Sequence, residues 1–220
     1  MSAVLEVPQS TVLEDPQIVV NGRSTASSLY RFTVKDYYRM LEAGILTEND
    51  RVELIRGEIR TMSPKGIKHS SSNDRANRYF QKLVGDRAMV RIQNPIHLDD
   101  HSEPEPDVVL AALTEDEYDY HHPAPPEILM ALEVADSSLF FDREEKSLLY
   151  AQAGIQQYCI LNLRNRELED YRNPGPDGYR SKQTYTADQS FTLVAFPDIP
   201  VEVNALLPRQ GKAGNQRRKK

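Results

Sequence analysis

EILMALEVADSSLFFDREEKSLLYAQAGIQQY, residues 127–158, is the stretch that decides the fold. Its apolar run from Ile128 to Leu132 is typical of a buried strand, and Glu133 follows as a single acid within that strand. A charged side chain in apolar surroundings is costly unless it is paired or bound to a metal ion. Glu133 therefore needs a partner.

A helix is predicted directly after this strand. The polar break at residues 136–138 is followed by Asp142 and Glu145, whose spacing is that of a capping box, so the helix is expected to begin at Asp142. Asp142, Lys146 and Tyr150 then share one helical face. A carboxylate that holds a metal and a lysine that stabilises a developing negative charge form a pair suited to cutting phosphodiester bonds.

The same stretch resembles the core signature of the Uma-type putative restriction endonuclease family, which is widespread in cyanobacteria and belongs to the PD-(D/E)XK nuclease superfamily. The family pattern is E-V, a Ser-rich turn, D-x-x-x-K-x-x-x-Y and A-x-x-G-[VI]-x-x-Y. The matching positions are Glu133-Val134, Ser137-Ser138, Asp142, Lys146, Tyr150, Ala151, Gly154-Ile155 and Tyr158. The resemblance covers about residues 30–208. We expect an α/β fold of restriction-endonuclease-like type, with a mixed central sheet flanked by helices.

A second acid comes at the start of another apolar run. Asp107 directly precedes Val-Val-Leu-Ala, and Pro106-Asp107 matches the "PD" of the superfamily pattern. Glu103, Glu105 and Asp107 alternate, so in an extended chain they would point to one side. Asp107 and Glu133 can meet across neighbouring strands and share a divalent cation, Mg²⁺ or Mn²⁺, because hard cations prefer oxygen ligands. The alternative for Asp107 alone is a turn residue at a strand start.

Two further residues are candidates for the site. Glu53 lies in VELIRGE, a segment that predicts two short strands joined by a turn at Gly57, and an early acid helps to hold the metal in this superfamily. The alternative is an exposed strand glutamate or an ion-pair partner. His69 precedes a predicted helix of about residues 70–85 and matches a family histidine; it is a candidate phosphate contact at a helix start, or an ordinary loop histidine.

The chain departs from the superfamily pattern at Ala135. The superfamily usually places its lysine at this position, two residues after the glutamate, so the resemblance implies that Lys146 supplies the amine from the helix. A methionine at position 146 is expected to keep the fold and the metal but to lose most of the activity. Tyr150 is expected to pack against the sheet. A second departure is at Cys159 and Asn162, where relatives tend to have Trp and Asp.

The remaining elements follow from local patterns. Thr33 and Asp36 form a second capping box, before a helix that stops near Gly44. Strands are predicted at about residues 17–20, 89–98, 157–163 and 166–172, the last as an edge strand that a turn at residues 174–178 connects to a returning strand. The closing residues to 207 add apolar core. His121 and His122 are expected to be loop residues.

Composition and charge limit the class of protein. The chain has 220 residues with a net charge of −6 and a single cysteine, Cys159, which lies in an apolar stretch and is expected to be a buried, inert thiol. No apolar run approaches the length of a membrane span, and the first residues lack the features of a signal peptide, so we expect a cytoplasmic protein with no membrane partner.

Three regions are expected along the chain: a flexible arm at residues 1–29, one nuclease-like domain at 30–208, and a basic tail at 209–220. The tail holds six basic residues and no acid, which leaves about −12 on the rest of the chain. The tail either holds DNA loosely by charge or is simply a solvated segment.

The hypothesis from sequence is a Mg²⁺-dependent endonuclease that hydrolyses DNA. Asp107 and Glu133 would hold the metal with help from Glu53, and Lys146 would orient the attacking water or stabilise the transition state. DNA is the expected partner, and a homodimer is left open. The first alternative is a non-catalytic module of the same fold that binds DNA or protein, which the acidic composition favours. The second is an enzyme acting on another phosphate ester.

Overall fold

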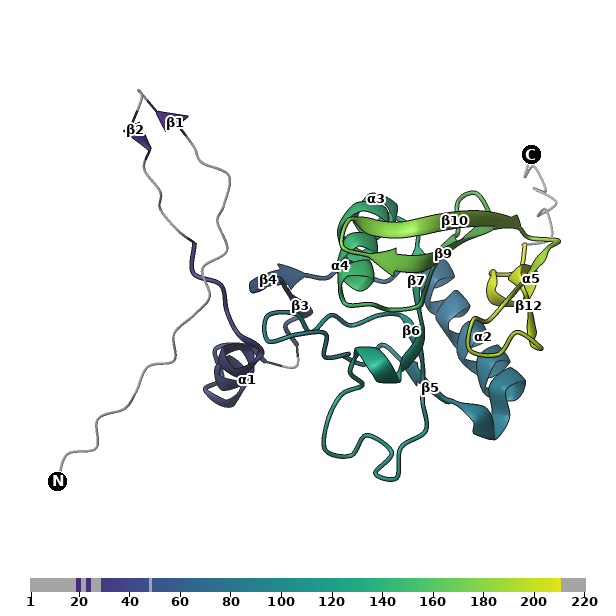
Figure 1. The fold of residues 1–220 in the computed structure, drawn as a ribbon, viewed down its shortest axis with the longest axis horizontal. Coiled ribbons are helices and arrows are strands. Elements are labelled where there is room, and N and C mark those ends of the chain that lie inside the picture. Colours follow the sequence, from purple (N-terminus) through teal and green to yellow (C-terminus); the bar gives the residue numbers. More distant parts are fainter. Residues whose placement is uncertain (1–18, 21–22, 25–28, 48, 211–220) are drawn as a thin grey trace, which may run out of the picture.

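A six-stranded mixed sheet organises the molecule (Figure 1). The computed structural model describes residues 19–20, 23–24, 29–47 and 49–210. The strand order is β10-β9-β8-β7-β6-β5. Neighbouring strands are antiparallel except β7 and β8, which are parallel. The strands are β5 (Met89–Ile92), β6 (Val108–Ala111), β7 (Ile128–Ala135), β8 (Gln157–Asn162), β9 (Glu167–Gly175) and β10 (Gly178–Thr186). The expected α/β fold is confirmed.

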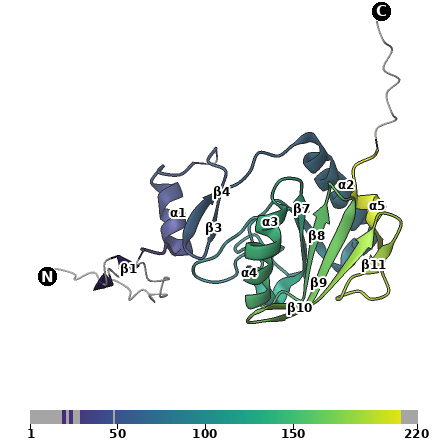
Figure 2. The ribbon, with the colours of Figure 1, turned by 90° about the horizontal axis from the view of Figure 1, so that it is seen from above.

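One face of the sheet is covered by two helices and a small hairpin (Figure 2). These elements are α2 (Ile67–Val84), α5 (Val203–Leu206), β11 (Ser190–Thr192) and β12 (Pro200–Glu202), and the short 3₁₀ turn η1 (Gly85–Arg87) ends α2. Phe80 of α2 packs here in one buried cluster with Leu132 of β7 and Leu161 of β8. Alternate residues of each strand supply this core, as expected for a strand whose side chains alternate between two faces.

The opposite face carries the second core and the functional residues. A continuous helical segment lies over it, made of α3 (Leu139–Phe141), the π-helical turn η3 (Asp142–Lys146) and α4 (Ser147–Gln152). This segment is the crossover between the parallel strands β7 and β8, which need such a connection. Tyr150, Tyr158 and Ile160 are fully buried in this cluster. The 3₁₀ turn η2 (Pro125–Glu127) leads into β7.

The N-terminal part of the domain adds a wall beside this second core. The hairpin β3 (Val52–Ile55) and β4 (Glu58–Thr61) turns at Gly57, as predicted, with φ of 73°. A Cβ at Gly57 would lie 2.6 Å from Cβ of Arg31, so both the conformation and the space favour glycine. The helix α1 (Val34–Glu42) has the predicted capping box between Thr33 and Asp36.

The structure corrects four predicted features. The helix after β7 begins at Leu139, not at Asp142, because Leu139 and Phe141 pack against the second core and Ser138 Oγ donates to Asp142 Oδ2 at 2.6 Å. The strand predicted at 166–172 is internal, because β10 pairs outside it. The helix α2 begins before His69. The strand predicted at 89–98 ends at Ile92, and Gln93 follows with a positive φ of 52°.

The predicted arm and tail fall almost entirely outside the described residues. Within the arm, β1 (Val19–Val20) pairs with β2 (Arg23–Ser24). Cys159 is fully buried, as expected, and burial raises the pKa of its thiol well above the ordinary value. No helix in the described part of the chain is both long and apolar enough to cross a membrane.

Candidate active site

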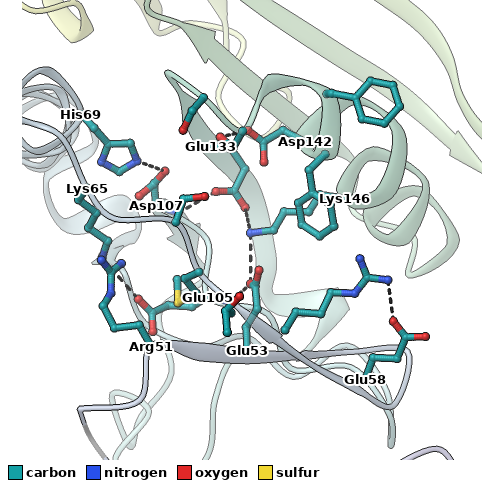
Figure 3. A pocket seen from close by; sticks show the side chains of 18 of the residues that line it. Arg51, Glu53, Glu58, Lys65, His69, Glu105, Asp107, Glu133, Asp142 and Lys146 are labelled. Atoms are coloured by element: carbon teal, nitrogen blue, oxygen red, sulfur yellow. Dashed lines mark hydrogen bonds and ion pairs between the residues drawn. The ribbon is translucent and has the colours of Figure 1, made fainter.

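A cavity of about 820 Å³ opens between the β3–β4 hairpin, the neighbouring ends of β6 and β7, and the α3–η3 segment (Figure 3). All five residues singled out from the sequence line it, although they come from five different elements or their edges: Glu53, His69, Asp107, Glu133 and Lys146. The structure therefore brings the predicted set together in one place. Their chemical roles stay predictions.

Asp107, directly before β6, and Glu133, in the neighbouring strand β7, lie opposite each other. The register Val108↔Leu132 and Val109↔Ala131 continues so that Asp107 lies opposite Glu133. The Asp107 backbone N–H donates to Glu133 Oε2 at 3.4 Å, and the Val134 N–H donates to Asp107 Oδ2 at 2.9 Å. The two carboxylates are thus held next to each other by the backbone of the sheet itself.

Asp107 is the most fully hydrogen-bonded group of the site. His69 Nε2 lies 3.0 Å from Oδ2, while Asn73 Nδ2 at 2.8 Å and Gln93 Nε2 at 3.0 Å both donate to Oδ1. Burial raises the pKa of Asp107, but these hydrogen bonds, led by His69, outweigh it and lower the pKa to about 2. Asp107 is therefore ionised at neutral pH. With the Val134 N–H, four donors occupy its oxygens, so a cation bound to Asp107 displaces at least one of them.

Glu133 has the opposite balance. Lys146 Nζ at 3.0 Å and Tyr150 Oη at 2.9 Å both donate to its Oε1. Burial is the largest effect and raises the pKa of Glu133 to about 8; Lys146 opposes this, and the nearby Asp107 adds to it. Lys146 therefore offsets only part of the effect of burial and of the neighbouring carboxylates on Glu133.

Lys146 lies between two glutamates. Its Nζ is 3.0 Å from Glu133 Oε1 and 3.2 Å from Glu53 Oε2, as Figure 3 shows, and the residue is 5% exposed. Glu53 Oε2 also accepts the Glu105 N–H at 3.1 Å. These carboxylates raise the pKa of Lys146 despite the opposing effect of burial, so its ammonium group stays charged.

The helical segment over the cavity contains one π-helical turn. The Ser147 N–H donates to the Asp142 carbonyl, five residues back, and such turns occur frequently at functional sites. From Lys146 onward the helix is regular, so Lys146 and Tyr150 lie one turn apart and reach the same oxygen of Glu133. Asp142 also lines the cavity, and burial raises its pKa to about 6.

Reasoning from sequence missed three contacts. Tyr150 was expected only to pack, but its hydroxyl binds Glu133. Asn73 and Gln93, which hold Asp107, had no signal beyond being polar positions near an apolar face. The shared side predicted for three acids is wrong for Glu103, which lies outside the cavity. Residues 104–107 form no strand, and Glu103 accepts a hydrogen bond from Tyr38 Oη at 2.6 Å.

The donor set fits a hard divalent cation. Mg²⁺ is typically bound by one or two carboxylates and keeps several waters, and Asp107 and Glu133 supply two adjacent carboxyl groups. Within the described residues no group of three or more His, Cys, Asp or Glu side chains is arranged to hold a metal ion. Lys146 occupies the space between Glu133 and Glu53, and the expected role of Glu53 as a third ligand stays a prediction.

Comparison with known proteins identifies the family and supports the fold. The model of the Uma2 family, described as "Putative restriction endonuclease", matches residues 34–204, so the chain belongs to the Uma2 family. The structure is similar to the crystal structure of a putative nuclease of the DUF820 family from Anabaena variabilis, with a TM-score of 0.62 and 14% identity over 80% of this chain and 97% of that chain. That likeness concerns the fold. No curated protein matches the chain.

Proposed function

We propose that this member of the Uma2 family is a metal-dependent endonuclease that hydrolyses phosphodiester bonds in DNA, with Asp107, Glu133 and Lys146 as its catalytic residues. The observation that carries the proposal is a charged lysine held against a buried carboxylate pair at the floor of one cavity. Family and fold indicate a nuclease-like protein. DNA as substrate and Mg²⁺ or Mn²⁺ as cofactor are part of the proposal.

Each residue has a distinct task in this mechanism. Asp107 and Glu133 would hold the cation, which supplies a Lewis acid and an activated water when bound. Lys146 donates hydrogen bonds to the negative charge that develops on the phosphate in the transition state. Tyr150 orients Glu133 from the same helix, while Asn73 and Gln93 keep Asp107 ionised and in place. His69, already bound to Asp107, is the proposed phosphate contact at the cavity edge.

A non-catalytic module is the second candidate, and one observation favours it. Lys146 forms ion pairs with both Glu133 and Glu53, and the chain carries a net charge of −6. Such a network is also found in proteins where it has only a structural role. A test must therefore separate a lysine used in catalysis from one used in folding.

Cleavage of supercoiled plasmid DNA in Mg²⁺ or Mn²⁺, by variants that circular dichroism shows to be folded, provides this test. Wild type should nick the plasmid, and EDTA should abolish nicking. Lys146→Met should lose about a hundred- to a thousandfold in rate, the usual loss for one transition-state donor. Lys182→Met is the matched control, because Lys182 forms the same kind of ion pair with Glu169, at 2.7 Å, outside the cavity. Wild type that cuts no DNA with any divalent metal would favour the module.

A further inference from the structure

The two walls of the cavity differ in chemistry. One wall, formed by the β3–β4 hairpin and the residues on either side of it, carries three cationic side chains: Arg51, Arg60 and Lys65. Arg60 pairs with Glu58 at 2.7 Å and Lys65 with Glu105 at 3.8 Å, so a bound phosphate would compete with these carboxylates for the two cations. The other wall is the start of the α3–η3 segment and carries Phe140. Figure 3 shows Arg51 and Lys65 across the cavity from the helix that bears Lys146. A basic wall suits phosphates, and an aromatic wall suits a flat apolar ring.

Phe140 is unusual in its exposure. It is 79% exposed, and among the exposed large apolar side chains in the described part of the chain, it is the one that lines the cavity. Its neighbour Phe141 packs inward instead, with the Arg60 guanidinium 5.4 Å from its ring centroid. An aromatic ring left in water at the mouth of a charged cavity is available to stack on a base.

The depth of the site limits what can enter. Glu133, Lys146 and Asp107 are at most 8% exposed, so a phosphate must descend to the floor of the cavity to meet them. The volume of about 820 Å³ lies within the usual range of pockets that bind one small ligand. In a duplex the bases are stacked inside the helix, and enzymes that need access to a nucleotide in a pocket take it out of the stack.

We propose that the substrate is single-stranded or locally unstacked DNA, whose base stacks on Phe140 while the flanking phosphates lie along Arg51, Arg60 and Lys65. This proposal rests on the proposed function and specifies its substrate class. Groove-and-stacking recognition of this kind is tolerant of sequence, because every base presents a flat face. It accounts for a cavity that combines a basic wall, an aromatic wall and an acidic floor.

The test measures binding of a fluorescent 12-nucleotide oligo(dT) and of a hairpin duplex by anisotropy, with Ca²⁺ in place of Mg²⁺ and a gel to confirm that the DNA stays intact. Phe140→Ala should weaken binding of the single strand about 5- to 150-fold, the range for loss of one base–aromatic stack, and leave duplex binding unchanged. Phe140→Trp should restore binding. Tyr120→Ala is the matched control, since Tyr120 is 87% exposed and outside the cavity.

The salt dependence of single-strand binding tests the basic wall separately. Arg51→Ala should lower the slope of log affinity against log salt by about 0.7, the value for one phosphate contact on a single strand. An unchanged slope would remove Arg51 from the phosphate path.

The outcomes separate this inference from the nuclease proposal. If wild type cuts duplex plasmid, and Phe140→Ala binds the single strand and cuts the plasmid as well as wild type does, the inference fails and the nuclease proposal stands. If no cleavage occurs with any metal but single-strand binding depends on Phe140, the inference holds for a binding protein. Tighter binding of oligo(rU) than of oligo(dT) would overturn DNA as the occupant.

Discussion

Glu133 and Glu169 lie on the same face of the sheet, in one row across three strands, yet their surroundings are opposite. Glu133 of β7 pairs with Ile160 of β8, which pairs with Glu169 of β9. Both glutamates are buried, and each is contacted by a tyrosine hydroxyl and by a cation from the same helical segment. Arg143 reaches Glu169, and Lys146, three residues later, reaches Glu133.

The two carboxylates differ in how much positive charge they receive. Glu169 has Arg143 and Lys182 to itself and accepts from Tyr171 Oη at 2.7 Å. Burial raises the pKa of Glu169, but these contacts outweigh it and lower the pKa to about 2. Glu133 shares Lys146 with Glu53, and burial raises its pKa to about 8.

This difference supports the proposed distinction between a structural carboxylate and a functional one. Glu169 is paired with two cations, so it contributes to folding. Burial and the neighbouring carboxylates raise the pKa of Glu133 more than Lys146 lowers it, and a buried group with a strongly shifted pKa in a cavity is typical of a functional site. We therefore interpret the region around Glu169 as a contact that holds the helix to the sheet, and we propose that the region around Glu133 holds a cation.

The largest expected effect is on stability when the central lysine is removed. Lys146→Met breaks two buried ion pairs and should cost roughly 3–5 kcal/mol of unfolding free energy, whereas Lys182→Met, at a residue whose side chain is 42% exposed, should cost about 1 kcal/mol or less. This corrects the expectation that a methionine at 146 leaves stability intact, since the structure shows that Lys146 is buried. Urea denaturation measures both, and equal losses would contradict the distinction.

A double variant sharpens the same comparison. Glu133→Gln combined with Lys146→Met replaces the buried carboxyl group that the single variant leaves without its cation, so it should recover part of the lost stability without recovering any cleavage. Strictly additive losses would mean that Lys146 and Glu133 do not interact.

Ionisation of the two carboxyl groups should change the stability at opposite ends of the pH range. Glu169 has a folded pKa of about 2, below its ordinary 4.5, so its contribution is present above pH 4.5 and is lost as the pH falls through 2. Glu133 has a folded pKa of about 8, above 4.5, so its contribution is present below pH 4.5 and is lost as the pH rises through 8. Melting temperatures measured from pH 2 to 9 should fall at the acid end because of Glu169 and at the alkaline end because of Glu133.

Two substitutions test which residue causes which loss of stability. Glu169→Gln should reduce only the loss at acid pH, and Glu133→Gln should reduce only the loss at alkaline pH. If the two effects were interchanged or absent, the proposed difference between the two carboxyl groups would be wrong.

Local patterns were enough to predict most of the fold and to select residues that meet at one cavity. The apolar runs of β6 and β7, each with one acid, and the spacing of Lys146 and Tyr150 are features of a few neighbouring residues. They placed Asp107, Glu133 and Lys146 correctly at one cavity.

Long-range pairing was beyond the reach of these patterns. Glu169 and Arg143 are 26 residues apart, and nothing in ELEDYR distinguishes a clamped glutamate from an exposed one. The start of the helix was misplaced for a related reason. The capping-box spacing at Asp142 is local, whereas packing of Leu139 and Phe141 against the second core decides where the helix begins.

The smallest expected effect concerns the basic tail, most of which lies outside the described residues. If its six basic residues supply the positive charge that the acidic site lacks, deletion of residues 209–220 should weaken nonspecific DNA binding and flatten its salt dependence. Titration of a labelled duplex at several salt concentrations measures this. Unchanged binding at low salt would show that the tail does not contribute to DNA binding.

Binding of Mn²⁺ measured by isothermal titration calorimetry at pH 7.5 tests the central claim most directly, because it does not depend on the substrate. Wild type and Glu169→Gln should each bind the ion at a site that Glu133→Gln lacks, since Glu133, unlike Glu169, lies beside Asp107 in the cavity. Absence of binding to folded wild type, or equal binding by Glu133→Gln, would contradict the account.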